Sequence, residues 1–208
     1  MRTSVLIVAT TLALALSACG GDKPAADTAA APADATSPDQ AAAAPAASAS
    51  TDPEIEQLKT VKPVEACAWL TPEKLSAAFP GLKFEVHQKL DPQMSGYTWD
   101  SRCTYWAGVG TIDFAKDVPT HTVEIFVNTV VSADKAKANL VSRAETAKTA
   151  TGYQPQTALG PNAYTVTSTG VAMLFFVKGQ SEVQMNFSDL KSPSAEKVKK
   201  LLEIAQGL

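Results

Sequence analysis

The sequence predicts an α+β fold, an antiparallel twisted sheet with helices on one face. Two sets of strand patterns are each followed by a helical pattern, and short glycine-containing turns separate several of the strands. Closely spaced strands of this kind pair antiparallel, and a helix with one apolar stripe covers a sheet. All 14 aromatic residues (3 Trp, 4 Tyr and 7 Phe) lie from residue 53 onward. We therefore expect residues 53–208 to form a single globular domain with a real hydrophobic core.

Residues 1–18 are typical of a signal peptide. Arg2 precedes an apolar stretch, residues 5–16, which is too short to span a membrane as a helix. Residues 20–52 hold 14 Ala and 4 Pro but no aromatic residue. Such a segment buries too little apolar area to offset its ordering entropy, and its prolines interrupt every helical run. We expect residues 19–52 to be a disordered tether.

The tether begins at a cysteine with a characteristic preceding sequence. Leu16, Ser17, Ala18 and Cys19 resemble the lipobox of bacterial lipoproteins at all four positions. The resemblance implies cleavage before Cys19 and attachment of lipid to its sulfur, so that two or three acyl chains hold the protein to a membrane. The alternative is a secreted protein with a chance cysteine after its cleavage site.

The residues after Cys19 bear on the choice of membrane. An Asp directly after the lipidated cysteine resembles an inner-membrane retention signal of Gram-negative lipoproteins. In this sequence Gly20 and Gly21 follow Cys19 instead. In a Gram-negative source this favours the outer membrane, with the domain facing the periplasm. The expected location is thus the cell envelope, with the membrane as a partner through the lipid on Cys19.

The formal net charge of −3 does not belong to the expected domain. Residues 53–208 hold 16 Lys and Arg against 16 Asp and Glu, whereas residues 20–52 hold one Lys against five Asp. A nucleic-acid-binding protein needs a basic face, and a membrane-surface module needs a polybasic cluster. We therefore expect no nucleic acid partner.

The first half of the domain contains two short helices, three strands and a long helix. A short entry helix ends before Pro63, and a second helix begins at Thr71, with Pro72 in its first turn. Residues 82–90 alternate as a strand that places His87 on its polar face. A polar, flexible stretch is expected at residues 91–100. The remaining elements are strands at 102–107 and 122–131 and a helix at 132–148.

The second half has the clearest pattern. Three strands at 163–168, 171–177 and 182–187 form a meander with short turns, and a helix opens at Ser192-Pro193 and closes at Gly207. Its apolar stripe consists of Ala195, Val198, Leu201, Leu202 and Ala205. Because both halves have three strands followed by a helix, a duplicated meander-plus-helix unit is one hypothesis for the domain.

With Cys19 assigned to lipid, the chain has two further cysteines, Cys67 and Cys103. Export places them in an oxidising compartment, which favours a structural disulfide. A loop of about 36 residues closed in this way stabilises a domain by about 4 kcal/mol in the chain-entropy model. The alternative is a redox pair, although catalytic dithiols usually follow a Cys-x-x-Cys pattern.

Several short motifs in the domain occur together in one family. These are Cys67-Ala68-Trp69-Leu70-Thr71-Pro72-Glu73, then Cys103, then Leu159-Gly160-Pro161-Asn162-Ala163-Tyr164, and finally Lys178-Gly179. Together they resemble a family of exported bacterial lipoproteins of unknown function. The resemblance implies an α+β fold, a paired Cys67 and Cys103, and no assigned activity.

The sequence offers little support for catalysis. It lacks Gly-x-Ser-x-Gly and His-Glu-x-x-His, and only His87 and His121 are available. An atypical site could pair His121 with Asp117 or Ser101. No zinc, calcium or phosphate-binding pattern occurs, so we expect no metal and no cofactor.

One cluster has the composition of a binding site. Tyr97, Trp99, Arg102, Tyr105 and Trp106 surround Cys103. Tyr and Trp combine an apolar body with a polar group and suit a ligand or peptide groove, but they serve equally to pack a core against a disulfide.

These observations favour a non-catalytic, membrane-anchored binding or interaction module. Its partner would be a protein, peptide or small-molecule ligand of unknown identity. The alternatives are an envelope enzyme with a site near His121 and a carrier of an apolar ligand, which requires an internal cavity of several hundred Å³.

Overall fold

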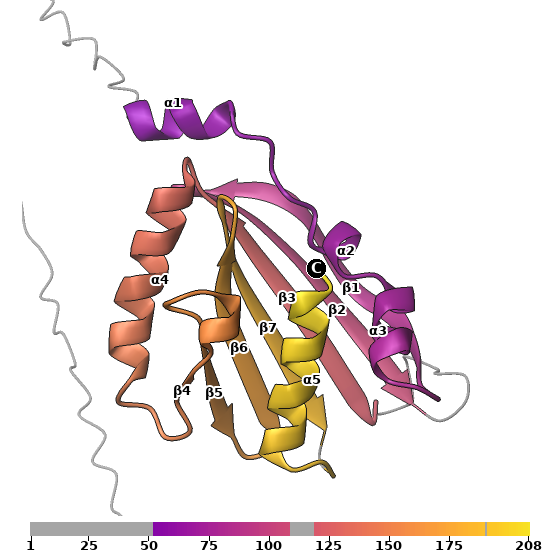
Figure 1. Ribbon diagram of the computed structural model, residues 1–208. Coiled ribbons are helices and arrows are strands. Elements are labelled where there is room, and N and C mark those ends of the chain that lie inside the picture. The colour runs from indigo at the N-terminus through magenta and orange to yellow at the C-terminus, as the bar shows by residue number, and fades with distance from the viewer. Residues whose placement is uncertain (1–51, 109–118, 190) are drawn as a thin grey trace, which may run out of the picture. The chain divides into compact units, whose positions relative to one another are not determined.

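A seven-stranded antiparallel sheet forms the centre of the computed structural model, which describes residues 52–108, 119–189 and 191–208 (Figure 1). The strand order is β1-β2-β3-β7-β6-β5-β4. The strands are β1 (Lys83–Ser95), β2 (Thr98–Gly108), β3 (His121–Thr129), β4 (Gln154–Pro155), β5 (Tyr164–Ser168), β6 (Val171–Lys178) and β7 (Ser181–Asp189). This confirms the predicted α+β class and its antiparallel sheet.

Helices connect and cover the strands at positions set by their capping residues. Thr71 and Ser132 each accept a hydrogen bond from the backbone N–H three residues on, so the helices begin where the sequence predicts. The helices are α1 (Pro53–Lys59), α2 (Ala66–Trp69), α3 (Pro72–Ala78), α4 (Ala133–Ala147) and α5 (Ser194–Gln206), with a 3₁₀ turn at Thr157–Leu159. The four-residue α2, the short β4 and the 3₁₀ turn lacked a sequence pattern long enough to predict them.

The helices lie on both faces of the sheet. α2, α3 and α5 pack on the face that carries Tyr105, Ile125 and Met185, which we call the core face (Figure 1). α4 packs through Leu140 and Ala144 against Tyr164 and neighbouring residues on the opposite face, which we call the α4 face. The prediction of helices on one face therefore holds for α2, α3 and α5 but not for α4. Alanines on one stripe let a helix approach a sheet closely, but they do not specify which face it covers.

The strands repeat but the helices do not. β1-β2-β3 and β5-β6-β7 are two meanders, and β3 and β7 pair with each other at the centre of the sheet. The helix after the first meander contacts β6 and β7 on the α4 face, whereas the helix after the second covers its own meander on the core face. The duplicated meander-plus-helix unit is therefore present only in the strands.

β1 is longer than predicted and replaces the expected flexible stretch. Ser95 pairs with Thr98 across a turn in which Gly96 has a φ of 59°. Residues 91–95 therefore belong to β1 and residues 98–100 to β2, with a turn between them, and the prediction of a flexible segment there was wrong. An edge strand can be polar, because one of its two sides has no neighbouring strand to pack against. Two register shifts bend the strand, and Val86 is 42% exposed instead of lying inward beside Phe84.

Cys67 on α2 and Cys103 on β2 form the expected disulfide, with their Cα atoms 5.2 Å apart. Cys103 is fully buried beneath the helix layer. None of the described helices has the length and apolar character that a membrane-spanning helix requires.

Candidate functional site

The five residues of the predicted aromatic cluster lie on two faces of the sheet. Side chains alternate along β2, so Trp99 and Tyr105 belong to the core face and Arg102 and Trp106 to the α4 face. Tyr97 lies in the turn before β2. The structure therefore does not bring the cluster together as one groove.

Tyr105 is part of the core. Its side chain is fully buried, and its hydroxyl donates a hydrogen bond to the carbonyl oxygen of Leu70, just after α2. Burial raises the pKa of Tyr105 far above its usual range, and the nearby Glu73 carboxylate adds to the effect. The hydroxyl stays neutral and serves to join the helix layer to the sheet.

Trp99 and Tyr97 attach α1 to the end of the sheet. The indole Nε1 of Trp99 donates to the carbonyl oxygen of Leu58 at 3.0 Å, and the hydroxyl of Tyr97 donates to Asp52 Oδ2 at 2.7 Å. The second bond raises the pKa of Tyr97 and lowers that of Asp52, because it favours the neutral phenol and the ionised carboxylate. These two aromatic residues hold the first helix of the domain.

Arg102 and Trp106 each contact the ring of another residue on the α4 face, Phe126 and His87 respectively. The Arg102 guanidinium carbon lies 5.6 Å from the centre of the Phe126 ring. The Trp106 indole stacks on His87, with 3.5 Å between ring centres and 12° between their planes. His87 therefore packs against an aromatic ring, although its place on the polar side of β1 is as predicted.

His121 lies at the end of the sheet, and both of its ring nitrogens have neighbours. Nδ1 is 2.8 Å from the Thr120 hydroxyl, and Nε2 is 3.6 Å from the buried carboxylate of Asp189. Ser101 is not its partner. β2 and β3 pair Ala107 with His121, six residues along the strand from Ser101, which bonds instead to the backbone at Val64 and Ala66. Asp117 lies outside the described residues.

The Asp189 carboxylate accepts hydrogen bonds from several donors beneath the start of α5. Burial alone would raise the pKa of Asp189, but the Ser192 hydroxyl, the Lys191 N–H and the nearby His121 together lower it. Lys197, only 2% exposed, donates from Nζ to the carbonyl oxygen of Ser192 at 2.7 Å. The network satisfies buried polar groups at a helix start, and the described residues contain no serine or cysteine nucleophile bonded to His121.

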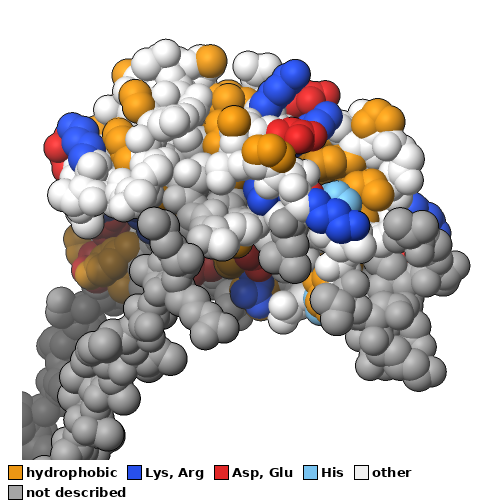
Figure 2. Space-filling model, turned by 90° about the horizontal axis from the view of Figure 1, so that it is seen from below, with side chains coloured by type: hydrophobic (Ala, Val, Ile, Leu, Met, Phe, Trp, Pro, Cys, Tyr) orange, Lys and Arg blue, Asp and Glu red, His pale blue; other side chains and the backbone are white. Residues whose placement is uncertain are grey.

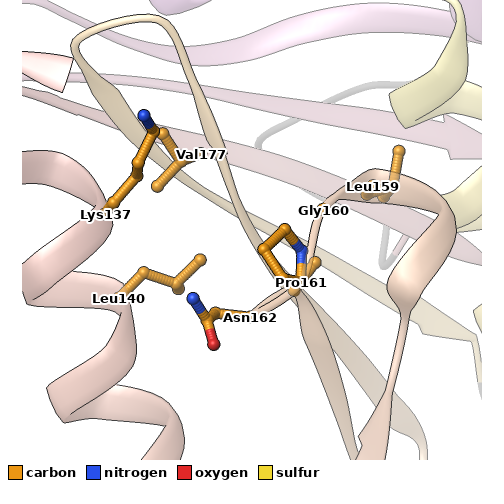
Figure 3. A pocket seen from close by; sticks show the side chains of 8 residues that line it. Lys137, Leu140, Leu159, Gly160, Pro161, Asn162 and Val177 are labelled. Carbon is orange, nitrogen blue, oxygen red and sulfur yellow. The ribbon is translucent and has the colours of Figure 1, made fainter. Parts of the chain in front are cut away.

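A small apolar pocket opens between α4, the loop before β5 and the end of β6 (Figure 3). Its volume is about 200 Å³. Apolar groups form most of its wall, and its polar side chains are the ammonium group of Lys137 and the amide of Asn162. The lining residues are Lys137, Leu140, Leu159, Gly160, Pro161, Asn162, Ala163 and Val177.

The loop of this pocket requires glycine and a small residue. Gly160 has a φ of 125° and a ψ of 164°, a region that essentially only glycine occupies. The loop then turns back, since the Ala163 N–H donates to the Gly160 carbonyl oxygen and Ala163 enters the core. Tyr164 stacks on Phe175 at 4.7 Å. These contacts explain the Leu159–Tyr164 motif physically, although the motif in the sequence did not predict a pocket.

α4 supplies the opposite wall. Leu140 lies on the helix face toward Val177 and Asn162, and Lys137 lies one turn earlier at the rim (Figure 3). The Lys137 ammonium is 3.2 Å from Asp134, and both side chains are largely exposed. The pocket thus combines an apolar wall with a cation that is only weakly paired.

Among the described residues, two open grooves lie beside α5. One lies between α3 and α5, lined by Ala77, Ala78 and Ile204, and another lies between α5 and β4, lined by Val198, Leu202 and Gln154. The surface seen in Figure 2 intersperses hydrophobic, basic and acidic side chains without a block of one charge. No group of three or more potential metal ligands occurs in the described part of the chain.

The fold is similar to that of an extracellular domain among the solved structures. No protein-family model matches the chain, and no curated protein matches it significantly. The extracellular domain of PknH from Mycobacterium tuberculosis is 14% identical, with a TM-score of 0.47, over 70% of this chain and 97% of that domain. A likeness at this level carries no functional conclusion.

Proposed function

We propose that this protein is a lipid-anchored lipoprotein of the cell envelope whose domain binds a small apolar group without catalysing a reaction. The lipobox at residues 16–19 supports the anchor, and the disulfide between Cys67 and Cys103 supports an oxidising compartment. The pocket beside α4 is the observation that carries the binding function. Its apolar wall and few polar groups are typical of a ligand site.

Binding of a neutral probe tests this function. Cyclohexanol should shift the amide resonances of Leu140, Ala163 and Val177 in the unlipidated chain, residues 20–208. Val177→Phe places a larger side chain in the pocket and should abolish the shifts. Val171→Phe is the matched control, because Val171 lies on the same face of the same strand but does not line the pocket. No saturable shift with cyclohexanol, or equal binding to both variants, would contradict the proposal.

The enzyme alternative has less support. His121 contacts Thr120 and Asp189, and the Thr120 hydroxyl also lies 3.1 Å from the carbonyl oxygen of Ala107. A threonine bonded in this way is not activated as a nucleophile. A carrier of a long apolar ligand would need a larger enclosed cavity than the pocket of about 200 Å³.

The anchor is tested separately from the pocket. Cys19→Ala should move the protein from the membrane fraction to the soluble fraction, and the mature wild-type chain should carry the mass of its acyl chains. A wild-type chain without added lipid mass would overturn the anchor and leave the pocket proposal standing.

A further inference from the structure

We infer that the pocket selects a small carboxylate with a compact apolar body, such as one ring or one short branched chain. The inference rests on the proposed binding function and adds the chemical class of the ligand. It depends on three features of the described residues: the size of the pocket, the charge at its rim and the amide of Asn162.

Size limits the apolar part of the ligand. A dry cavity of about 150 Å³ accepts benzene, and sites for drug-sized molecules begin at about 300 Å³. The volume of about 200 Å³ lies between these values. One ring or one branched chain fits it, whereas a long acyl chain does not.

Charge at the rim favours an anion. Lys137 is the only charged side chain in the lining, and no acidic side chain contributes to it. Asp134 pairs with Lys137, but its side chain is 93% exposed, and pairs of this kind contribute little. A ligand carboxylate can therefore replace Asp134 at the ammonium group at little cost.

The nearest buried carboxylate does not cancel this preference. Glu182 pairs with Val177 across β6 and β7, so its side chain lies beside Val177 on the α4 face. Its Oε1 accepts a hydrogen bond from Asn139 Nδ2 at 2.7 Å, and its Oε2 is 3.3 Å from Arg143 Nε. The negative charge of Glu182 is thus compensated from α4, and the positive charge of Lys137 dominates at the rim.

Asn162 adds a neutral donor. Its side chain makes no hydrogen bond within the described residues, while the N–H groups of Leu159, Gly160 and Ala163 are all bonded within the loop. The Asn162 amide can therefore donate to a ligand oxygen. An amide N–H can donate to a carboxylate or to a carboxamide oxygen, so Asn162 can hold either ligand, whereas the Lys137 ammonium favours the charged carboxylate.

An isosteric pair of probes tests the inference. Cyclohexanecarboxylate and cyclohexanecarboxamide have the same shape, and cyclohexanemethylamine has the opposite charge. We expect the carboxylate to bind residues 20–208 about two- to fivefold more tightly than the carboxamide, since an exposed ion pair contributes up to about that factor. The amine should bind more weakly than both, and the preference should disappear in 1 M salt.

Matched lysine variants locate the preference. Lys137→Gln should remove the preference for the carboxylate over the carboxamide. Lys148→Gln is the control, because Lys148, the C-cap residue of α4, is also exposed and paired with an acid three residues earlier, but it lies outside the pocket. Equal affinity for carboxylate and carboxamide in the wild type, or a preference that survives in Lys137→Gln, would overturn the inference while cyclohexanol binding still supported the proposed function.

Discussion

At the scale of single residues, Tyr105 joins two layers of the domain through one hydroxyl group. Tyr105→Phe keeps the ring in the core but leaves the carbonyl oxygen of Leu70 without its donor. An unsatisfied buried polar group costs about 1–3 kcal/mol, and we expect that loss in the free energy of unfolding. Chemical denaturation measures it. A variant as stable as the wild type would show that this hydrogen bond contributes nothing.

Asp189 is the residue whose ionisation should affect stability. Its folded-state pKa lies below the ordinary value of 3.8, so its ionised form stabilises the fold at pH values above about 4. This contribution is lost as the pH falls through the lowered folded-state pKa. Asp189→Asn should therefore cost about 1–3 kcal/mol at pH 6, and its difference from the wild type should shrink toward pH 2.

Denaturation curves at several pH values measure this effect. Asp134→Asn serves as the control, because the exposed Asp134 carboxylate makes only one surface ion pair. A difference between Asp189→Asn and the wild type that stays constant from pH 6 to pH 2 would contradict the role given to the Asp189 charge.

At the scale of elements, α1 depends on two aromatic side chains that are distant in sequence. Trp99→Phe removes the bond from Nε1 to Leu58 and should cost about 1 kcal/mol. Tyr97→Phe removes a bond at an exposed site, so it should cost less. Hydrogen exchange of the α1 amides tests this order. Faster exchange in Tyr97→Phe than in Trp99→Phe would reverse the assignment of the main contact.

The elements also show why some of the fold could be predicted and some could not. β7 was predicted at residues 182–187 and spans Ser181–Asp189, because a central strand with one buried face must alternate. The start of β1 followed the same rule. Residues 91–95 did not follow this alternation, because an edge strand needs no apolar face. Their strand conformation depends on pairing with β2 across the turn, which the pattern of residues 91–95 does not show.

The candidate site was harder to predict than the elements that form it. The residues of the predicted cluster around Cys103 are close in sequence, but the alternation of β2 sends them to opposite faces of the sheet. The pocket brings Lys137 and Leu140 of α4 close to Val177 of β6. That contact depends on α4 packing against the α4 face, and the alanine stripe of α4 contains no information about the choice of face.

At the scale of the whole molecule, three contacts attach the helices that precede β1 to the sheet. Tyr105, Trp99 and Cys103 all connect the core face of the sheet to the helices before it in the chain. These contacts attach the N-terminal helices of the domain to the sheet, so they should contribute to the stability of the domain as a whole.

The disulfide is the strongest of these connections, and its loss should affect the whole domain. It closes a loop across a sequence separation of 36 residues between α2 and β2. Cys67→Ala combined with Cys103→Ala should lower the free energy of unfolding by about 4 kcal/mol, because the unfolded chain regains the entropy of that loop. The unfolding midpoint in urea, with and without reductant, measures the change. Reductant should destabilise the wild type and leave the double variant unaffected. If the double variant unfolds within about 1 kcal/mol of the oxidised wild type, hydrogen bonds such as that of Tyr105, and not the disulfide, hold the helix layer to the sheet.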